Sequence, residues 1–202
     1  MPRIRSMIRF MTESRMNVPA DQIFAFLDDP ASFEQLFPPQ ERAKAPKGQQ
    51  GLITGKRLVL VLYGGFMPAR WVLETTKLES PHFFEQTMVH GPFRHFRHRC
   101  RLMPDGKDGT LIRDSVEFQM RYGWLGWFFA RRRARRRLRA IFSHRHSVIL
   151  KAMTGRTYDT SELRCRDVTG SNLDDAEERG WLPSEQPKPK SKRGRFRSKR
   201  KF

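Results

Sequence analysis

Cysteine, acidic residues and long apolar runs are all scarce in this chain of 202 residues. The two cysteines, Cys100 and Cys165, fall in a predicted strand and in a polar segment, so we expect no structural disulfide and a reduced, cytoplasmic protein. The basic start lacks the apolar centre of a secretory signal. No stretch approaches the roughly 18 uncharged apolar residues that a membrane-spanning helix needs, which excludes a helical membrane protein.

Acidic residues are outnumbered by basic ones, 21 to 40, and the net charge is +19. The excess is not confined to one end, because residues 1–154 hold 27 basic and 13 acidic side chains and residues 155–202 hold 13 and 8. A surface this basic attracts nucleic acid, anionic lipid headgroups or acidic proteins. The charge therefore indicates classes of partner and says nothing about the fold.

Sequence motifs of the familiar catalytic and cofactor sites are also missing. There is no nucleophile elbow, P-loop or dinucleotide-binding glycine pattern. The histidines do not suggest a metal site, because His95 and His98 fall on opposite faces of a strand, and His144 and His146 are two residues apart on a helix. We therefore expect no metal, no cofactor and no catalytic residue that the sequence alone identifies.

What is present is a series of strands followed by one long helix. Alternating or β-branched segments predict strands at 7–18, 52–63, 69–79, 82–90, 94–103 and 110–120. A helix that Pro19 opens and a second short helix at 31–37 follow the first strand. The connections between the later strands are too short for crossover helices, and 104–109 is a hairpin signal, so we expect an antiparallel sheet.

The periodicity changes at Trp124, where a helix is predicted to run to about Met153 and to end at Gly155. Its apolar face follows three- and four-residue steps, through Leu138, Ile141, Phe142, Arg145 and Ile149. After this helix the composition becomes polar. We expect residues 154–202 to be a disordered tail that ends in a basic low-complexity segment at 187–202.

Five segments carry a resemblance to a known superfamily: 18–30, 36–39, 91–98, 109–118 and 138–146. In order and spacing they resemble the SRPBCC superfamily of ligand-binding domains, also called START-like or polyketide cyclase/dehydrase-like. The resemblance covers residues 7–153 and implies an α+β helix-grip fold. In that fold a curved antiparallel sheet of about six to seven strands surrounds a long C-terminal helix, with two short helices after the first strand. Phe96 stands where one branch often has tryptophan, and the helix is richer in arginine than the resemblance leads us to expect.

The resemblance further implies a cavity between sheet and helix that holds a hydrophobic small molecule such as a lipid, a quinone or a polyketide-like compound. Inward positions supply the predicted lining, which is Trp71, Phe84, Met88, Phe96, His98, Cys100, Phe118, Met120, Phe142, His146 and Ile149. The alternative for each of these residues is that it only packs the core. Asp114 is expected to be a structural residue of its strand.

The start of the long helix carries a dense run of arginines. They are Arg131, Arg132, Arg133, Arg135, Arg136, Arg137 and Arg139. Aromatic residues within 124–129 precede them, and this composition is typical of a helix at an anionic membrane interface and would also suit a phosphate backbone. The alternative is an ordinary solvated face. Phe196 and Phe202 lie among the basic residues of the tail, where they permit stacking on nucleic-acid bases.

Three functions remain open on the sequence. The first is a non-enzymatic carrier or sensor that binds a hydrophobic ligand and touches an anionic membrane from the cytoplasmic side. The second is a cyclase or aromatase in which His98 and His146 take part, and a buried, paired polar cluster in the cavity would favour it. The third is a nucleic-acid-binding or ribosome-associated protein that uses the arginine run and the basic tail.

Overall fold

The computed structural model describes residues 7–64, 68–120, 124–155 and 164–167, with the backbone alone for 124–131 and 164–167. The described elements are, in chain order, β1 (Ile8–Met16), α1 (Ala20–Asp28), the 3-10 helices η1 (Pro30–Ser32) and η2 (Pro39–Glu41), β2 (Arg57–Leu62), β3 (Ala69–Glu79), β4 (Phe83–His90), β5 (Phe93–Asp105), β6 (Gly109–Met120), α2 (Trp124–Thr154) and β7 (Arg164–Asp167). The predicted strands and the long helix are confirmed, with bounds that differ by a few residues.

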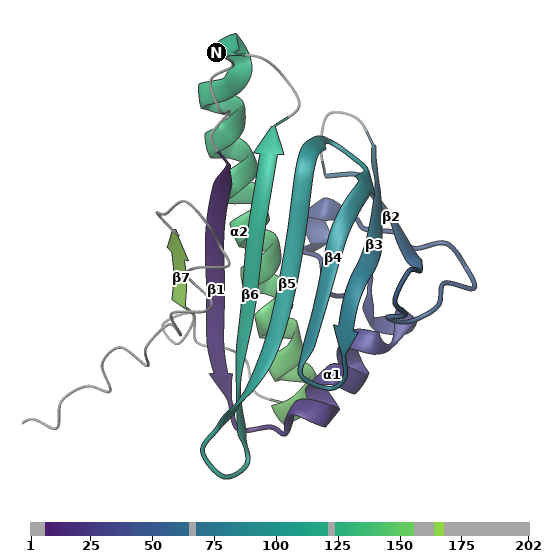
Figure 1. Cartoon of the computed structure of the whole chain (residues 1–202), viewed down its shortest axis with the longest axis vertical. Helices are drawn as coiled ribbons and strands as arrows, with labels where there is room; N and C mark the ends of the chain where they lie inside the picture. The colour runs from purple at the N-terminus through teal and green to yellow at the C-terminus, as the bar shows by residue number, and fades with distance from the viewer. Residues whose placement is uncertain (1–6, 65–67, 121–123, 156–163, 168–202) are drawn as a thin grey trace, which may run out of the picture. The chain divides into compact units, whose positions relative to one another are not determined.

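The strands form one antiparallel sheet in the order β2-β3-β4-β5-β6-β1-β7, with α2 packed across it (Figure 1). Strands β2 to β6 follow one another as hairpins, as the short connections predict. The turn between β5 and β6 uses Gly106 at a φ of 76°, a left-handed conformation that favours glycine. The first strand then pairs with β6 along its whole length, from Ile8 opposite Phe118 to Met16 opposite Thr110. The predicted helix-grip fold is therefore confirmed.

Strand β7 was not expected. Residues 164–167 lie in the predicted disordered tail, and they pair with β1 instead, with Phe10 opposite Asp167 and Glu13 opposite Arg164. The prediction of disorder is wrong for these four residues. Pairing with β7 gives hydrogen-bond partners to backbone groups of β1 that would otherwise be unpaired at the edge of the sheet. No local sequence pattern predicts such a contact between distant segments. The basic segment 187–202 lies outside the described residues.

The second predicted helix after β1 is shorter than expected. Pro19 precedes α1, as expected, but the helix predicted at 31–37 is only the 3-10 turn η1 followed by turns, and η2 adds a further 3-10 turn. The long helix ends as expected at Gly155, whose φ is 67° and whose N–H donates to the Lys151 carbonyl at 3.0 Å. No helix among the described residues is long and apolar enough to cross a membrane.

The core lies between the sheet and α2. The predicted apolar face of α2 is buried, and its members Leu138, Ile141, Phe142 and Ile149 are each 5 % exposed or less. Leu138 and Phe142 pack with Phe10 and Phe118 of the sheet, and Phe10 meets Phe142 edge to face at 5.8 Å between ring centroids. The grip of α2 on the sheet is therefore centred on β1 and β6, whose side chains face it.

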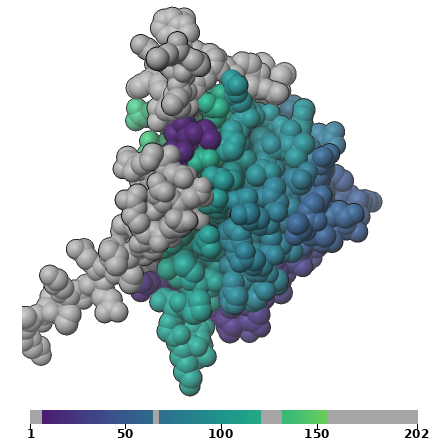
Figure 2. Space-filling model, in the orientation of Figure 1, coloured from purple at the N-terminus to yellow at the C-terminus, as the bar shows by residue number. Residues whose placement is uncertain are grey.

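The face of the sheet turned away from α2, which is the face seen in Figure 2, carries several charged pairs. Arg9 contacts Glu117 at 2.6 Å, Arg97 contacts the same carboxylate at 3.3 Å, and Arg99 contacts Glu85 at 2.6 Å. These pairs connect neighbouring strands. They also neutralise part of the positive charge that the composition places on the domain.

Candidate functional site: a pocket between the sheet and the helices

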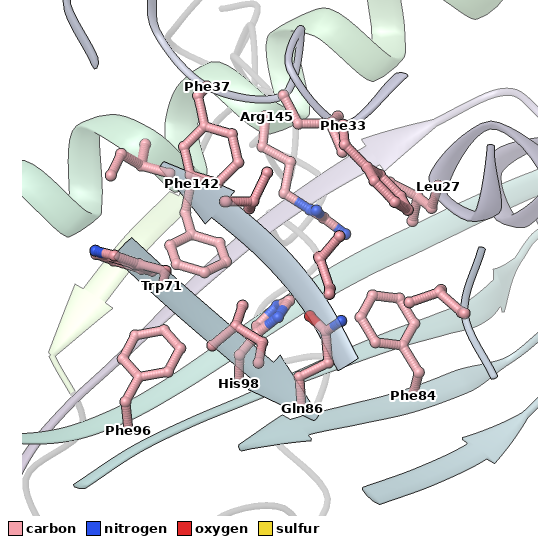
Figure 3. Close-up of a pocket in the computed structure, with 16 residues that line it drawn as sticks. Leu27, Phe33, Phe37, Trp71, Phe84, Gln86, Phe96, His98, Phe142 and Arg145 are labelled. Carbon is pink, nitrogen blue, oxygen red and sulfur yellow. The ribbon is translucent and has the colours of Figure 1, made fainter. Parts of the chain in front are cut away.

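A pocket opens between the inner face of the sheet, α2 and the segment that contains α1 and η1 (Figure 3). It contains about 610 Å³ of empty space, counted together with the part that is open to solvent. Its lining is mainly aliphatic and aromatic, and consists of Leu27, Phe33, Leu36, Phe37, Leu52, Leu58, Leu60, Trp71, Leu73, Phe84, Gln86, Phe96, His98, Ile141, Phe142 and Arg145. A concave, apolar site with a few polar groups is the usual form of a small-molecule site.

The pocket exists because α2 covers only part of the sheet. This helix packs against β1 and β6, while β2, β3 and β4 extend beyond it and bend round its side. Each of these strands, like β5, contributes alternate residues to the lining, such as Trp71 and Leu73 on β3, because side chains in a strand point to one face every second residue. Phe33 and Phe37, which follow α1, close the remaining side.

The structure brings together five of the eleven residues that the sequence predicted for the cavity. Trp71, Phe84, Phe96, His98 and Phe142 are in the lining. The other six lie elsewhere in the fold and are not part of it, namely Met88, Cys100, Phe118, Met120, His146 and Ile149. Five of these six belong to the two core clusters or pack against them, and His146 is fully buried on α2. Contact with a ligand stays a prediction for the five.

A buried polar cluster borders the pocket. The carboxylate of Asp114, fully buried at the centre of β6, lies 2.9 Å from His98 Nε2 through Oδ1 and 2.9 Å from His146 Nε2 through Oδ2. Arg145 Nε lies 3.2 Å from the same Oδ2 as an ion pair. A hydrogen bond of 2.6 Å joins Ser14 Oγ to His146 Nδ1. Two strands and α2 are thereby connected through one carboxylate.

The charge states in this cluster follow from its burial. Burial alone would raise the pKa of Asp114, but the charge of Arg145 and the hydrogen bonds of the two histidines lower that pKa well below its ordinary value. Burial lowers the pKa of His98, although Asp114 opposes the shift. The cluster therefore contains an ionised carboxylate beside a cationic arginine and a neutral His98. Burial and the charge of Asp114 together raise the pKa of the Cys100 thiol.

The protonation of the His98 ring is fixed by its partner. Since an ionised carboxylate only accepts hydrogen bonds, Nε2 of the neutral ring carries the proton and Nδ1 carries a free lone pair. His98 is the histidine of the cluster that belongs to the pocket lining. Ser14, His146 and Asp114 contain the residue types of a hydrolytic triad, but Ser14 is 2 % exposed and is not in the lining. This trio therefore anchors the helix rather than attacking a substrate.

Two polar side chains of the lining have nitrogen atoms that make no hydrogen bond among the described residues. Nε2 of Gln86 makes no hydrogen bond, and this residue is 4 % exposed. Nε and Nη2 of Arg145 also make none, although Nε is close to Asp114. Figure 3 shows both side chains directed into the pocket, Arg145 from α2 and Gln86 from β4 on the opposite side. Buried donors without acceptors are uncommon and call for an explanation.

The arginine run of α2 is divided by the fold. Arg132, Arg133 and Arg136 are exposed, whereas Arg137 points back and pairs with Glu41 of η2, its Nε lying 2.7 Å from Oε1. Arg135 and Arg139 are half-buried and have interactions of their own. The side chain of Arg131 and those of the aromatic segment 124–129 lie outside the described residues. The exposed part of the predicted basic surface therefore contains at least Arg132, Arg133 and Arg136.

Sequence reasoning missed most of the partners of this site. The sequence predicts Asp114 only as a structural residue of its strand, and no local pattern shows that His98 and His146 both contact it. Arg145 did leave a signal, since it falls on the apolar face of α2. Gln86 left one too, because it alternates with Phe84 and Met88 on one face of a strand. Among the described residues no group of histidine, cysteine and acidic side chains could hold a metal ion.

The family model for polyketide cyclase/dehydrase and lipid transport proteins matches residues 7–144. The chain belongs to this family. Its membership supports a role in binding a hydrophobic small molecule. No curated protein matches the chain.

Solved structures show the same fold at low identity. An aromatase/cyclase from a Streptomyces species is similar over 74% of this chain and 93% of its own, with 19% identity and a TM-score of 0.52. A START superfamily protein from Mycobacterium smegmatis is similar over 73% of this chain and 98% of its own, with 13% identity and a TM-score of 0.54. A protein from Arthrobacter aurescens covers 72% of this chain and 87% of its own, with 15% identity and a TM-score of 0.54.

Proposed function

We propose that this protein binds a hydrophobic small molecule in the pocket between the sheet and α2, and that it acts as a carrier or sensor of that molecule. The observation that carries the proposal is the lining itself, in which thirteen of the sixteen residues are aliphatic or aromatic and only Gln86, His98 and Arg145 are polar. Such a surface gains from removing an apolar ligand from water. Lipids, quinones and polyketide-like compounds are the candidate ligands.

A cyclase or aromatase activity is the second candidate, and the polar cluster favours it. His98 faces the pocket with a free Nδ1 lone pair and is held in orientation by Asp114, which is the arrangement a general base requires. In this reading the base takes a proton from a carbon next to a ligand carbonyl, and the pocket sets the direction of ring closure. We place the carrier function first because the lining offers no nucleophile and His98 alone has a catalytic geometry.

We also propose that Arg132, Arg133 and Arg136 bring the protein to an anionic membrane surface on the cytoplasmic side, where a carrier meets its ligand. Three exposed cations within two turns of one helix support this contact. A ribosomal RNA or another nucleic acid would use the same charges together with the basic tail. The two partners are separated by a vesicle-binding and an RNA-binding measurement made at the same salt concentration.

The experiment that tests the first function is native mass spectrometry with defined compounds. The full chain is incubated with a fatty acid, a short-chain quinone, a sterol and an aromatic ketone in turn. We expect a one-to-one complex with at least one class. When the bound compound carries an isotope label, an excess of the same unlabelled compound should displace it. If no class forms such a complex at concentrations where each is soluble, the proposal is wrong. If a bound aromatic ketone is instead converted to a product of different mass, the enzymatic candidate is favoured.

A further inference from the structure

Gln86 and Arg145 give the pocket one end that donates hydrogen bonds. Gln86 Nε2 is buried without an acceptor among the described residues, and the same holds for Arg145 Nη2. A buried donor that stays unpaired destabilises the fold, and a bound acceptor would remove that cost. Trp71 Nε1 is also unpaired, but Figure 3 shows its indole nitrogen directed away from the other two side chains.

The two donors are held in place by their neighbours. Gln86 lies opposite His98 in the pairing of β4 with β5, so both side chains rise from the same face of the sheet. His98 and Arg145 both contact Asp114. The guanidinium of Arg145 also lies 5.8 Å from the centre of the Phe84 ring, whose residue neighbours Gln86 on the same strand face. An acceptor between Arg145 and Gln86 would therefore meet groups that are already oriented.

The charge balance at this end favours a neutral acceptor. The positive charge of Arg145 is already matched by the carboxylate of Asp114, and His98 is neutral. An anionic ligand would add a second negative charge close to Asp114 in a buried site, where a charge without a partner is costly. A carbonyl oxygen accepts the same hydrogen bonds without this cost.

We propose that Arg145 and Gln86 recognise a neutral carbonyl oxygen on an otherwise apolar ligand and so determine which hydrophobic compounds the pocket prefers. This inference rests on the proposed binding function and adds the chemical class of the ligand. Ketones, esters and quinones carry such an oxygen. Hydrocarbons lack it, and carboxylates carry it with a charge.

Three naphthalene compounds of similar shape separate these cases: acetylnaphthalene, ethylnaphthalene and naphthoate. Their dissociation constants are measured by calorimetry for the wild-type protein, for Gln86→Leu and for the control Gln40→Leu, which makes the same change at an exposed residue outside the lining. We expect the ratio of the affinities for acetylnaphthalene and ethylnaphthalene to fall about three- to tenfold in Gln86→Leu, the range of one lost hydrogen bond, and to change less than about twofold in Gln40→Leu. Naphthoate is expected to bind more weakly than acetylnaphthalene.

The carbonyl stretching frequency of bound acetylnaphthalene provides an independent measure. Donated hydrogen bonds lower this frequency, so we expect it to be lower in the wild-type complex than in hexane, with part of the shift lost in Gln86→Leu. Should that variant fail to fold, the shift in the wild-type complex alone decides. An unchanged affinity ratio, a frequency equal to that in hexane, or tighter binding of naphthoate would each overturn the inference. Binding of ethylnaphthalene would leave the proposed function standing in those cases, whereas absence of binding by all three compounds would count against both.

Discussion

His146 Nε2 lies 2.9 Å from Asp114 Oδ2, so the C-terminal half of α2 is hydrogen-bonded to the centre of β6 by two side chains that are fully buried. This contact decides where the helix lies along β6. Arg145 precedes His146 and Phe142 lies one turn before it, and both belong to the pocket lining. The buried pair therefore positions one wall of the pocket without being part of its surface.

The substitution Asp114→Asn removes the negative charge that His98, His146 and Arg145 contact. Arg145 then remains as a largely buried cation without a counter-charge, and the loss of one member of such a pair costs about 3 to 5 kcal/mol. The free energy of unfolding in urea measures this loss. The control is Asp105→Asn at an exposed pair with Arg15, where we expect a change under about 0.5 kcal/mol. Equal effects of the two substitutions would show that the buried cluster is not a stabilising element.

The free energy of unfolding is expected to decrease as the pH is lowered, in two separate pH ranges. The pKa of His98 is lower in the folded protein than its ordinary 6.5, so below that pH the unfolded chain takes up a proton that the folded one does not. The pKa of Asp114 is lowered from 3.8, so its contribution is present above that value and is lost as the pH falls through the folded pKa. Unfolding measured between about pH 7 and pH 5 includes the contribution of His98.

The variant His98→Gln should remove the pH dependence of stability that we assign to His98. A glutamine amide can still donate to Asp114 but does not titrate, so the free energy of unfolding should become flatter in that pH range. His90→Gln is the matched control, because His90 is exposed at the end of β4. A slope that is unchanged in His98→Gln, or one that disappears equally in the control, would contradict the assignment.

The sequence predicted the sheet and α2 well because their signals are local. Alternation of side chains defines a strand, and the glycine-rich turn at 104–109 defines a hairpin. The polar cluster could not be predicted in the same way, since Ser14, His98, Asp114 and His146 meet only through strand register and helix position. The pocket residues after α1, such as Phe33 and Phe37, have the spacing of a helix face, but no local pattern shows that they lie against the sheet.

Cys100 should be chemically inert in the folded protein. Burial and the neighbouring Asp114 raise the pKa of its thiol, so little of the reactive thiolate forms at neutral pH. In a Cys165→Ser background, we expect iodoacetamide to label Cys100 at the rate of transient opening rather than at the rate of a free thiol. Mass spectrometry of the labelled chain, with and without urea, makes the comparison. Rapid labelling without urea would show that β5 opens far more often than its burial implies.

Exposed arginines on α2 should control attachment to anionic vesicles. Replacing Arg132, Arg133 and Arg136 together by glutamine removes three charges, each worth about 1 kcal/mol near an anionic surface, and should weaken vesicle binding by at least tenfold. Arg137→Gln is the control, because that side chain is paired with Glu41, and we expect it to reduce stability more than binding. Sedimentation with phosphatidylserine vesicles at low and high salt provides the measurement. Equal losses in both variants would argue for a general effect on folding.

Calorimetric titration of ethylnaphthalene into two tryptophan variants tests most directly whether the pocket is the binding site. Leu58→Trp places a large ring at a half-buried residue of the lining, and Leu111→Trp makes the same change at a half-buried residue of β6 outside it. We predict that Leu58→Trp weakens binding by at least about tenfold because the ring occupies the space of the ligand, while Leu111→Trp stays within about twofold of the wild-type protein. Equal binding by both variants would contradict the account.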